Sequence, residues 1–175
     1  MLKDNYVNIH SFEPIKQNYN HLNYNLSGFA NIKMYNNALS DKKEQIKMIN
    51  NIPQKGFNAG MCARFDTYIN TLSYNKKYNE NQREYWRNTI SKMNVTEIVD
   101  AITVDSLRLK PSLIKIDVEG DELKVIMGAI KTIKNHSPVL YVEDNCDFYS
   151  EELQNLLKTI GYSSVSEHPW IHIKN

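Results

Sequence analysis

Acidic side chains follow three apolar segments of the chain, at the point where each segment ends. Glu13 comes after the first segment, Asp117 and Glu119 after a second, and Glu143 after a third. The carboxyl ends of parallel strands meet at one edge of an α/β sheet, where such folds bind ligands. Carboxylates gathered there repel one another, which raises their pKa values unless a cation or a hydroxyl-rich ligand compensates. The sequence therefore predicts a ligand site at this edge.

Helix capping is the competing explanation for these acids, because the positive end of a helix dipole favours a carboxylate. It accounts well for Asp121 and Glu122, which open an amphipathic segment. It accounts poorly for Glu13 and Glu143, each of which directly follows its own strand. Ligand binding is thus the stronger interpretation of the strand-end acids.

Strands and helices alternate along the chain, and these elements must position the acids. Apolar or alternating segments predict strands at residues 6–12, 29–35, 45–49, 59–65, 96–104, 113–116, 138–142, 163–167 and 170–173. Amphipathic stripes predict helices at residues 15–26, 121–134 and 150–160. The strands at 113–116 and 138–142 read as buried on both faces. This order predicts one α/β domain over residues 1–175, with a parallel sheet covered on both sides.

Residues 66–93 interrupt this alternation with a tyrosine- and asparagine-rich segment of interleaved charges. Two glutamate–arginine pairs have helical spacing there, which favours a solvated helix. The pairs are Glu80 with Arg83 and Glu84 with Arg87. A lid over a substrate is one alternative. A nucleic-acid patch that adds Lys76 and Lys77 to these arginines is the other.

The composition excludes several classes of protein. A formal net charge of +1 gives no steer toward nucleic acid or an anionic membrane. No segment approaches the roughly 20 apolar residues of a membrane helix, and the first five residues lack the apolar core of a signal peptide. We therefore expect a cytoplasmic protein with neither a membrane nor a nucleic-acid partner.

Cysteine and histidine give little indication of a metal site. Cys62 and Cys146 lie far apart and form no metal-binding motif. His168 and His172 could share one face of a strand, but no acidic or cysteine ligand lies beside them. We expect no metal.

One segment is more specific than any of these patterns. Residues 115–122, Lys-Ile-Asp-Val-Glu-Gly-Asp-Glu, resemble the K-I-D-V-E-G-x-E hallmark of FkbM-type S-adenosylmethionine-dependent methyltransferases. Further segments resemble that family in the same order, at residues 12–14, 37–41, 103–107 and 138–143. The resemblance implies a Rossmann-like class I methyltransferase sheet flanked by helices, with S-adenosylmethionine as the cofactor.

The resemblance also implies roles for individual residues. Glu13, followed by Pro14, matches the acid that accepts hydrogen bonds from the ribose hydroxyls of S-adenosylmethionine. Ala38 and Leu39 fall where the adenine lies, and Asp117 falls beside the methionine part of the cofactor.

Asp117 and Glu119 are the candidate catalytic residues. Either could take the proton of a hydroxyl acceptor, and either could instead hold the cofactor's cationic amino group. The sequence leaves both assignments open.

The chain departs from the family's pattern at its beginning. The class I fold starts with a strand, a glycine-rich turn and a helix, and too few residues precede Glu13 to supply them. We therefore expect an N-terminally truncated domain that lacks the first strand and helix. Three arrangements would fill the vacancy: direct pairing of the 6–12 strand with the Lys115 strand, a strand from another copy in a homo-oligomer, or a further part of a longer gene product.

These observations favour an O-methyltransferase that acts on a sugar or secondary-metabolite hydroxyl, with a small molecule or a glycan as acceptor; this substrate class is implied by the resemblance alone. The alternative is a non-catalytic, truncated methyltransferase-like binding module. A hydrolase that holds Mg²⁺ with the same carboxylates is a third hypothesis.

Overall fold

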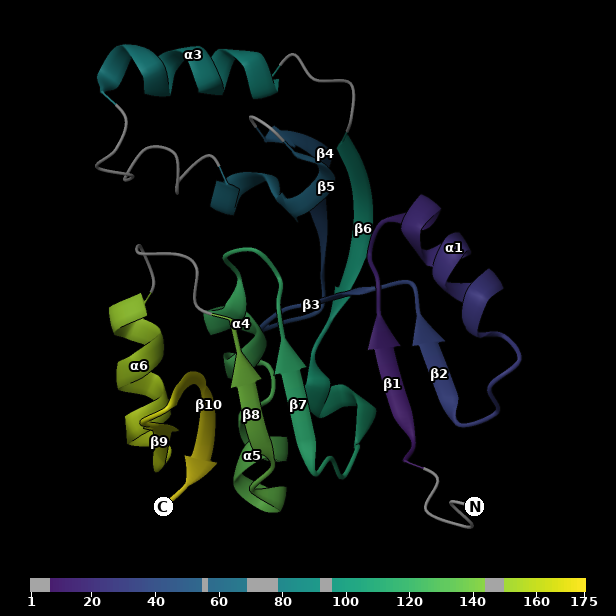
Figure 1. Cartoon of the computed structure of the whole chain (residues 1–175), viewed down its shortest axis with the longest axis vertical. Coiled ribbons are helices and arrows are strands. Elements are labelled where there is room, and N and C mark those ends of the chain that lie inside the picture. The colour runs from purple at the N-terminus through teal and green to yellow at the C-terminus, as the bar shows by residue number, and fades with distance from the viewer. Residues whose placement is uncertain (1–6, 55–56, 69–78, 92–95, 144–149) are drawn as a thin grey trace.

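The strands that the structure describes form three hydrogen-bonded sheets (Figure 1). The computed structural model describes residues 7–54, 57–68, 79–91, 96–143 and 150–175. Within these residues the architecture is mixed α/β, as the sequence predicts. The strands do not join into the single parallel sheet that the alternation of elements led us to expect.

A βαβ unit opens the described chain. Strand β1 (Ile9–Phe12) runs parallel to β2 (Ile32–Tyr35), and helix α1 (Lys16–Leu26) connects them. The predicted apolar stripe contributes little, because α1 has no buried residue of its own, whereas Ile15 just before it is fully buried. Strand β2 begins after the predicted start at Phe29, which still belongs to the turn that follows α1.

The second sheet is built from four strands of the middle of the chain. In spatial order they are β3 (Ala38–Leu39), β6 (Thr96–Ile102), β4 (Glu44–Gln54) and β5 (Phe57–Arg64). The sequence predicts strands at 45–49 and 59–65, but β4 continues through Pro53 and pairs with β5 as a hairpin. The register shifts between Ile49 and Gln54, which is how a ladder accommodates a residue without an N–H.

The third sheet comes from the last third of the chain. In spatial order its strands are β7 (Leu113–Ile116), β8 (Val139–Val142), β10 (His168–Lys174) and β9 (Tyr162–Val165). Strands β7 and β8 are parallel, whereas β10 is antiparallel to both of its neighbours. The sheet is therefore mixed, with its parallel edge at β7.

Three helices pack on one face of this third sheet. They are α4 (Glu122–Met127), α5 (Ile130–His136) and α6 (Ser150–Thr159). Their apolar side chains form one core with Ile116 and Leu140 of the strands. On the opposite face Leu113 is 58% exposed and Val139 is 39% exposed. The prediction that β7 and β8 are buried on both faces is therefore wrong.

Gly128 and Ala129 break the single helix predicted over residues 121–134 into α4 and α5. The break lies against the loop after β3, because a Cβ at Gly128 would stand 2.0 Å from the Ser40 carbonyl oxygen. Only glycine allows two backbones to come so close. This contact joins the third sheet's helices to the second sheet.

Asp105 caps α5 from a distant part of the sequence. It lies in a short 3-10 helix, η1 (Val104–Leu107), and its carboxylate accepts hydrogen bonds from the backbone N–H groups of Lys131 (3.1 Å) and Thr132 (2.8 Å). An acid at this place satisfies N–H groups that a helix cannot pair internally. The family-like segment at 103–107 therefore has a structural function here.

Strands β1 and β7 point in the same direction in Figure 1, yet they do not pair. Among the described strands, β1 pairs with β2 and β7 pairs with β8. Of the three arrangements left open by the sequence, direct pairing of the 6–12 strand with the Lys115 strand is therefore wrong. A strand from another copy and a longer gene product stay predictions.

The 66–93 segment contains a solvent-facing helix, α3 (Glu80–Ser91), which lies at the end of the molecule in Figure 1. Glu84 and Tyr85 on this helix are exposed, in agreement with the predicted solvated helix. Residues 69–78, with Lys76 and Lys77, lie outside the described residues. The lid and the nucleic-acid patch stay predictions.

Candidate functional site

One pocket is lined by residues from all three sheets. Phe12 and Glu13 come from the end of β1, Ala38 and Leu39 from β3, and Asp117 from the end of β7. Binding sites for small molecules and cofactors are concave and mostly apolar, with a few convergent polar groups. Apolar side chains and carboxylates meet in this pocket, which makes it the candidate binding site.

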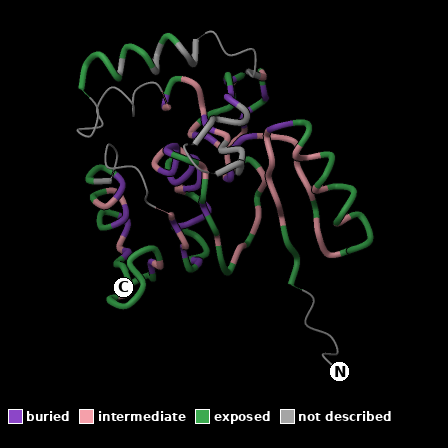
Figure 2. The backbone as a smooth tube through the Cα atoms, turned by 45° about the horizontal axis from the view of Figure 1, so that its top comes forward, coloured by how far each residue is buried: buried purple, intermediate pink, exposed green. Residues whose placement is uncertain are grey.

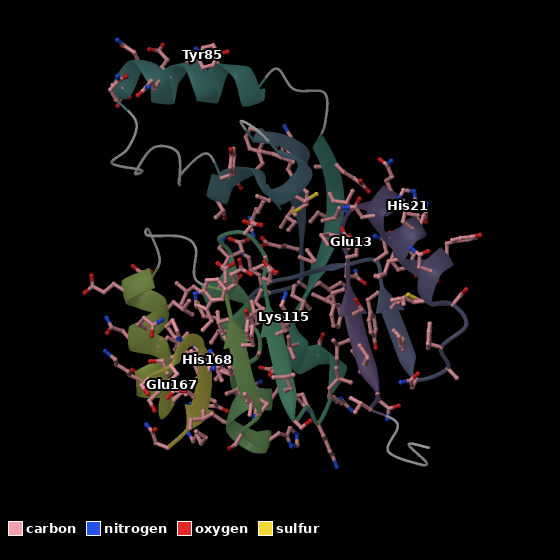
Figure 3. The ribbon with its side chains drawn as sticks, in the orientation of Figure 1. Glu13, His21, Tyr85, Lys115, Glu167 and His168 are labelled. Carbon is pink, nitrogen blue, oxygen red and sulfur yellow. The ribbon has the colours of Figure 1, made fainter. Side chains whose placement is uncertain are left out.

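All five residues predicted to bind a cofactor line this one pocket: Glu13, Pro14, Ala38, Leu39 and Asp117. They come from segments as far as 104 residues apart in sequence (Glu13 and Asp117), so only the fold brings them together. Figure 3 labels Glu13 at the end of β1 and Lys115 within β7. The predicted catalytic residue Glu119 is not among the lining residues, although it follows Asp117 closely.

The Glu13 carboxylate also contributes to the start of α1. Its Oε1 accepts the backbone N–H of Ile15 at 2.8 Å. Glu13 therefore does stabilise the start of the following helix, a role that the sequence did not favour for this acid. Burial raises the pKa of Glu13, and the charge of Glu97 raises it further, while hydrogen bonds from Ile15 and Asn18 lower it; the result lies above the usual value. A ligand that offers hydroxyl donors or positive charge would relieve this cost.

Asp117 is exposed at the end of β7 and is paired with Lys115. The Lys115 Nζ donates to Asp117 Oδ2 at 2.8 Å, and this bond raises the pKa of the lysine. Both side chains are solvent-exposed, and such pairs contribute only about 0–1 kcal/mol. The pair can therefore open to admit a ligand at little cost.

Glu119 occupies a crowded acidic position. Partial burial raises its pKa, and the neighbouring charges of Asp117, Glu122 and Glu143 raise it further. Its backbone is left-handed, with φ 56°, which is uncommon for a residue with a side chain. The mutual repulsion predicted for acids at the strand ends is therefore present at Glu119.

An ionic cluster ties β5 to the start of α4, and the sequence analysis missed it. The Arg64 Nη1 donates to Glu44 Oε1 at 2.9 Å and lies 3.8 Å from Asp121 Oδ2. Asp121 also receives the Thr67 hydroxyl at 2.5 Å and the Lys124 ammonium at 3.0 Å. These bonds connect the β4–β5 hairpin to the turn that follows Asp117.

Asp121 is therefore no helix cap. It stands at the N-cap position of α4 without a side-chain capping bond, because its carboxylate is committed to the cluster. Arg64 also lines the pocket beside Cys62, two residues earlier on β5. The sequence did offer one indication of this cluster, because Arg64 follows small and apolar residues in a strand. A charge in such a position needs a partner.

A family model described as the methyltransferase FkbM domain matches residues 2–164. The chain belongs to the FkbM methyltransferase family. Its hallmark segment at 115–122 forms the end of β7, the turn with Asp117 and Glu119, and the first residue of α4. The family resemblance inferred from the sequence is thereby confirmed.

The fold is also similar to a solved structure of this family. The crystal structure of methyltransferase FkbM from Methylobacillus flagellatus KT superposes with a TM-score of 0.54 at 15% sequence identity. The match covers 95% of this chain and 36% of that one, so this FkbM chain spans little more than a third of that protein's length. No curated protein matches the chain.

Within the described residues of this FkbM chain, no three histidine, cysteine, aspartate or glutamate side chains gather to hold a metal ion. Of the two histidines considered for such a site, His168 is exposed and His172 is buried on β10, with a register shift between them. None of the described helices has the length and apolar composition needed to cross a membrane.

Proposed function

We propose that this chain binds S-adenosylmethionine in the pocket between β1, β3 and β7, as part of an enzyme that methylates a hydroxyl oxygen. The observation that carries the proposal is the convergence of Glu13, Pro14, Ala38, Leu39 and Asp117 on one pocket. Membership of a methyltransferase family supports the same reaction class.

The chemistry of the pocket fits the proposed cofactor. The side chains of Ala38 and Leu39 offer an apolar wall to a flat heteroaromatic ring, while Glu13 offers a charged acceptor to ribose hydroxyls. Asp117 supplies negative charge where a cation is to be held. Hydrogen bonds to a charged group contribute about 1.5–3 kcal/mol each, so Glu13 alone can affect the affinity strongly.

When bound, S-adenosylmethionine supplies an electrophilic methyl group on a positively charged sulfur. In the proposed transfer the acceptor oxygen would take the methyl group, the sulfur would keep the electron pair of the broken carbon–sulfur bond, and a carboxylate of this chain would take the hydroxyl proton. We assign Glu119 to proton acceptance because it follows the lining residue Asp117 by two positions, and because its raised pKa makes it a stronger base than an ordinary carboxylate. We assign Asp117, which lines the pocket, to the cofactor's cationic end.

The acceptor is proposed to be a sugar or secondary-metabolite hydroxyl. The support for this class is the family alone. The crowded carboxylates around Glu119 agree with a neutral acceptor rather than an anionic one.

Binding of S-adenosylhomocysteine, the demethylated product, tests the proposal. We expect the free energy of unfolding to rise by about 2.7 kcal/mol at 100 times the dissociation constant. Glu13→Ala should weaken binding at least tenfold, since it removes charged hydrogen bonds. Glu167→Ala, which changes an exposed acid on the turn before β10, is the matched control and should bind as the wild type does.

Calorimetric titration gives the affinities, and thermal melting shows that each variant is folded. A folded wild-type chain with no response to millimolar S-adenosylhomocysteine would refute the proposal in favour of the non-catalytic alternative. Equal affinity of Glu13→Ala and wild type would remove Glu13 from the site while leaving the cofactor in place.

A further inference from the structure

The turn between β7 and α4 has an unusual backbone. Two consecutive residues are left-handed, Glu119 at φ 56° and Gly120 at φ 110°. Glycine adopts this conformation readily, but glutamate does so at a cost. A turn of this kind persists only where neighbouring groups hold it. Something in the structure must therefore fix the backbone that carries Asp117 and Glu119.

The Glu122 carboxylate makes the required contacts. Its Oε1 accepts the backbone N–H of Gly120 at 3.1 Å and that of Val118 at 3.3 Å, so one oxygen spans Glu119 on both sides. Glu122 is 5% exposed. The carboxylate therefore points back into the turn and is sealed from water, where it replaces the solvent that these N–H groups would otherwise bond.

Two acids close to Glu122 in the sequence are engaged elsewhere. Asp121, the adjacent residue, accepts hydrogen bonds from Thr67 and Lys124. Asp117 is exposed and paired with Lys115. Loss of the Glu122 oxygen would leave the N–H groups of Val118 and Gly120 without their carboxylate partner.

We infer that Glu122 is a positioning residue: through the N–H groups of Val118 and Gly120 it fixes the turn that directs Asp117 into the pocket and holds Glu119 beside it. The two hydrogen bonds are observed in the structure, whereas their effect on cofactor affinity rests on the proposed function. The conformation of the turn then depends on the position of the Glu122 Oε1 atom. The negative charge of Glu122 is secondary, because both hydrogen bonds are made to this one acceptor atom.

Two conservative variants separate position from charge. Glu122→Gln keeps an acceptor oxygen at the same reach and loses the charge. Glu122→Asp keeps the charge and withdraws the oxygen by one methylene group. Both keep a polar side chain of similar size, so both should fold where a truncation would not. Glu151→Asp makes the same change in the first turn of α6, at an exposed site, and serves as the control.

Two measurements are made on each variant. Amide hydrogen exchange by NMR reports the N–H groups of Val118 and Gly120, and calorimetry reports the affinity for S-adenosylhomocysteine. Glu122→Asp should speed exchange of both amides by on the order of tenfold and weaken binding by a similar factor. Glu122→Gln and the Glu151→Asp control should stay within about twofold of wild type in both measurements, because the oxygen remains in place.

The two proposals fail in different ways. A wild type that binds no S-adenosylhomocysteine overturns the proposed function, while the amide exchange still decides whether Glu122 holds the turn. A wild type that binds, with Glu122→Asp binding equally well, overturns the positioning role alone. The opposite ranking, with Glu122→Gln the more damaging variant, would show that the charge of Glu122 acts rather than its position.

Discussion

The two sides of the pocket are packed very differently. On the side of β7, the third sheet and helices α4, α5 and α6 share one large core of fully buried side chains, among them Ile126, Ile133 and Leu140. On the side of β1, a smaller core gathers around Ile15 and the second sheet. Figure 2 shows the contrast, because α1 has no buried segment whereas α4, α5 and α6 do.

The two residues proposed to bind opposite ends of the cofactor therefore follow sheets that are packed to different degrees. Asp117 follows the well-packed third sheet, whereas Glu13 follows a two-stranded sheet with an exposed connecting helix. Local opening of a protein concentrates where few apolar contacts are buried. We therefore expect the Glu13 side to order further when a ligand binds and the Asp117 side to be fixed beforehand.

Matched leucine truncations on the two sides give the largest expected effect. Leu140→Ala removes a fully buried side chain from the third sheet and should lower the free energy of unfolding by about 2–5 kcal/mol. Leu22→Ala changes a half-buried side chain of α1, a helix without buried residues, and should cost less than about 1 kcal/mol, because substitutions outside a core have small effects. Urea unfolding followed by circular dichroism measures both. Equal losses would show that the two sides are one cooperative core.

A glycine pair tests the contact that joins the sides, with a smaller expected effect. Gly128→Ala would place a Cβ 2.0 Å from the backbone oxygen of Ser40, and the resulting shift should cost about 1–3 kcal/mol. Gly28→Ala is the control, since nothing lies within 4 Å of its Cβ position. Thermal melting compares the two variants. An unchanged midpoint for Gly128→Ala would mean that the β3 loop moves aside freely.

The sequence predicts the well-packed side better than the other. The short apolar strand at 113–116 and the helix from Ser150 were placed correctly, because strong hydrophobic periodicity decides such elements. The break at Gly128 was missed, since it depends on the approach of Ser40 from a distant segment. Pairing of strands into three sheets was missed for the same reason, because it depends on contacts between segments far apart in sequence.

The candidate site shows the same division. The family resemblance at residues 115–122 located Asp117, and the convergence of Glu13 and Ala38 on the same pocket followed from it. The cluster of Arg64 and Asp121 could not be predicted, because a charge pair across 57 residues leaves no local pattern. Sequence reasoning thus found the residues that resemble a motif and missed those defined by their partners.

The smallest effect is expected at Glu119. It tests whether the ionised carboxylate of this residue lowers the stability of the β7 side of the pocket. The pKa of Glu119 is raised above its ordinary value of 4.5, by partial burial first and then by neighbouring acids. The folded state therefore binds this proton more tightly than the unfolded state, so stability falls as the pH rises from about 4.5 through the raised pKa. Glu119→Gln removes this loss. We expect its melting temperature to exceed that of wild type at pH 7, and the difference to shrink at pH 4.

The size of this gain should stay below about 1 kcal/mol, because solvent screens a side chain that is only partly buried. Glu151→Gln, an exposed acid in the first turn of α6, is the control and should show the same small difference from wild type at both pH values. A Glu119→Gln variant less stable than wild type at pH 7 would mean that the ionised carboxylate is held by a favourable contact. In that case repulsion among the strand-end acids would not be what prepares this side of the pocket for a cation.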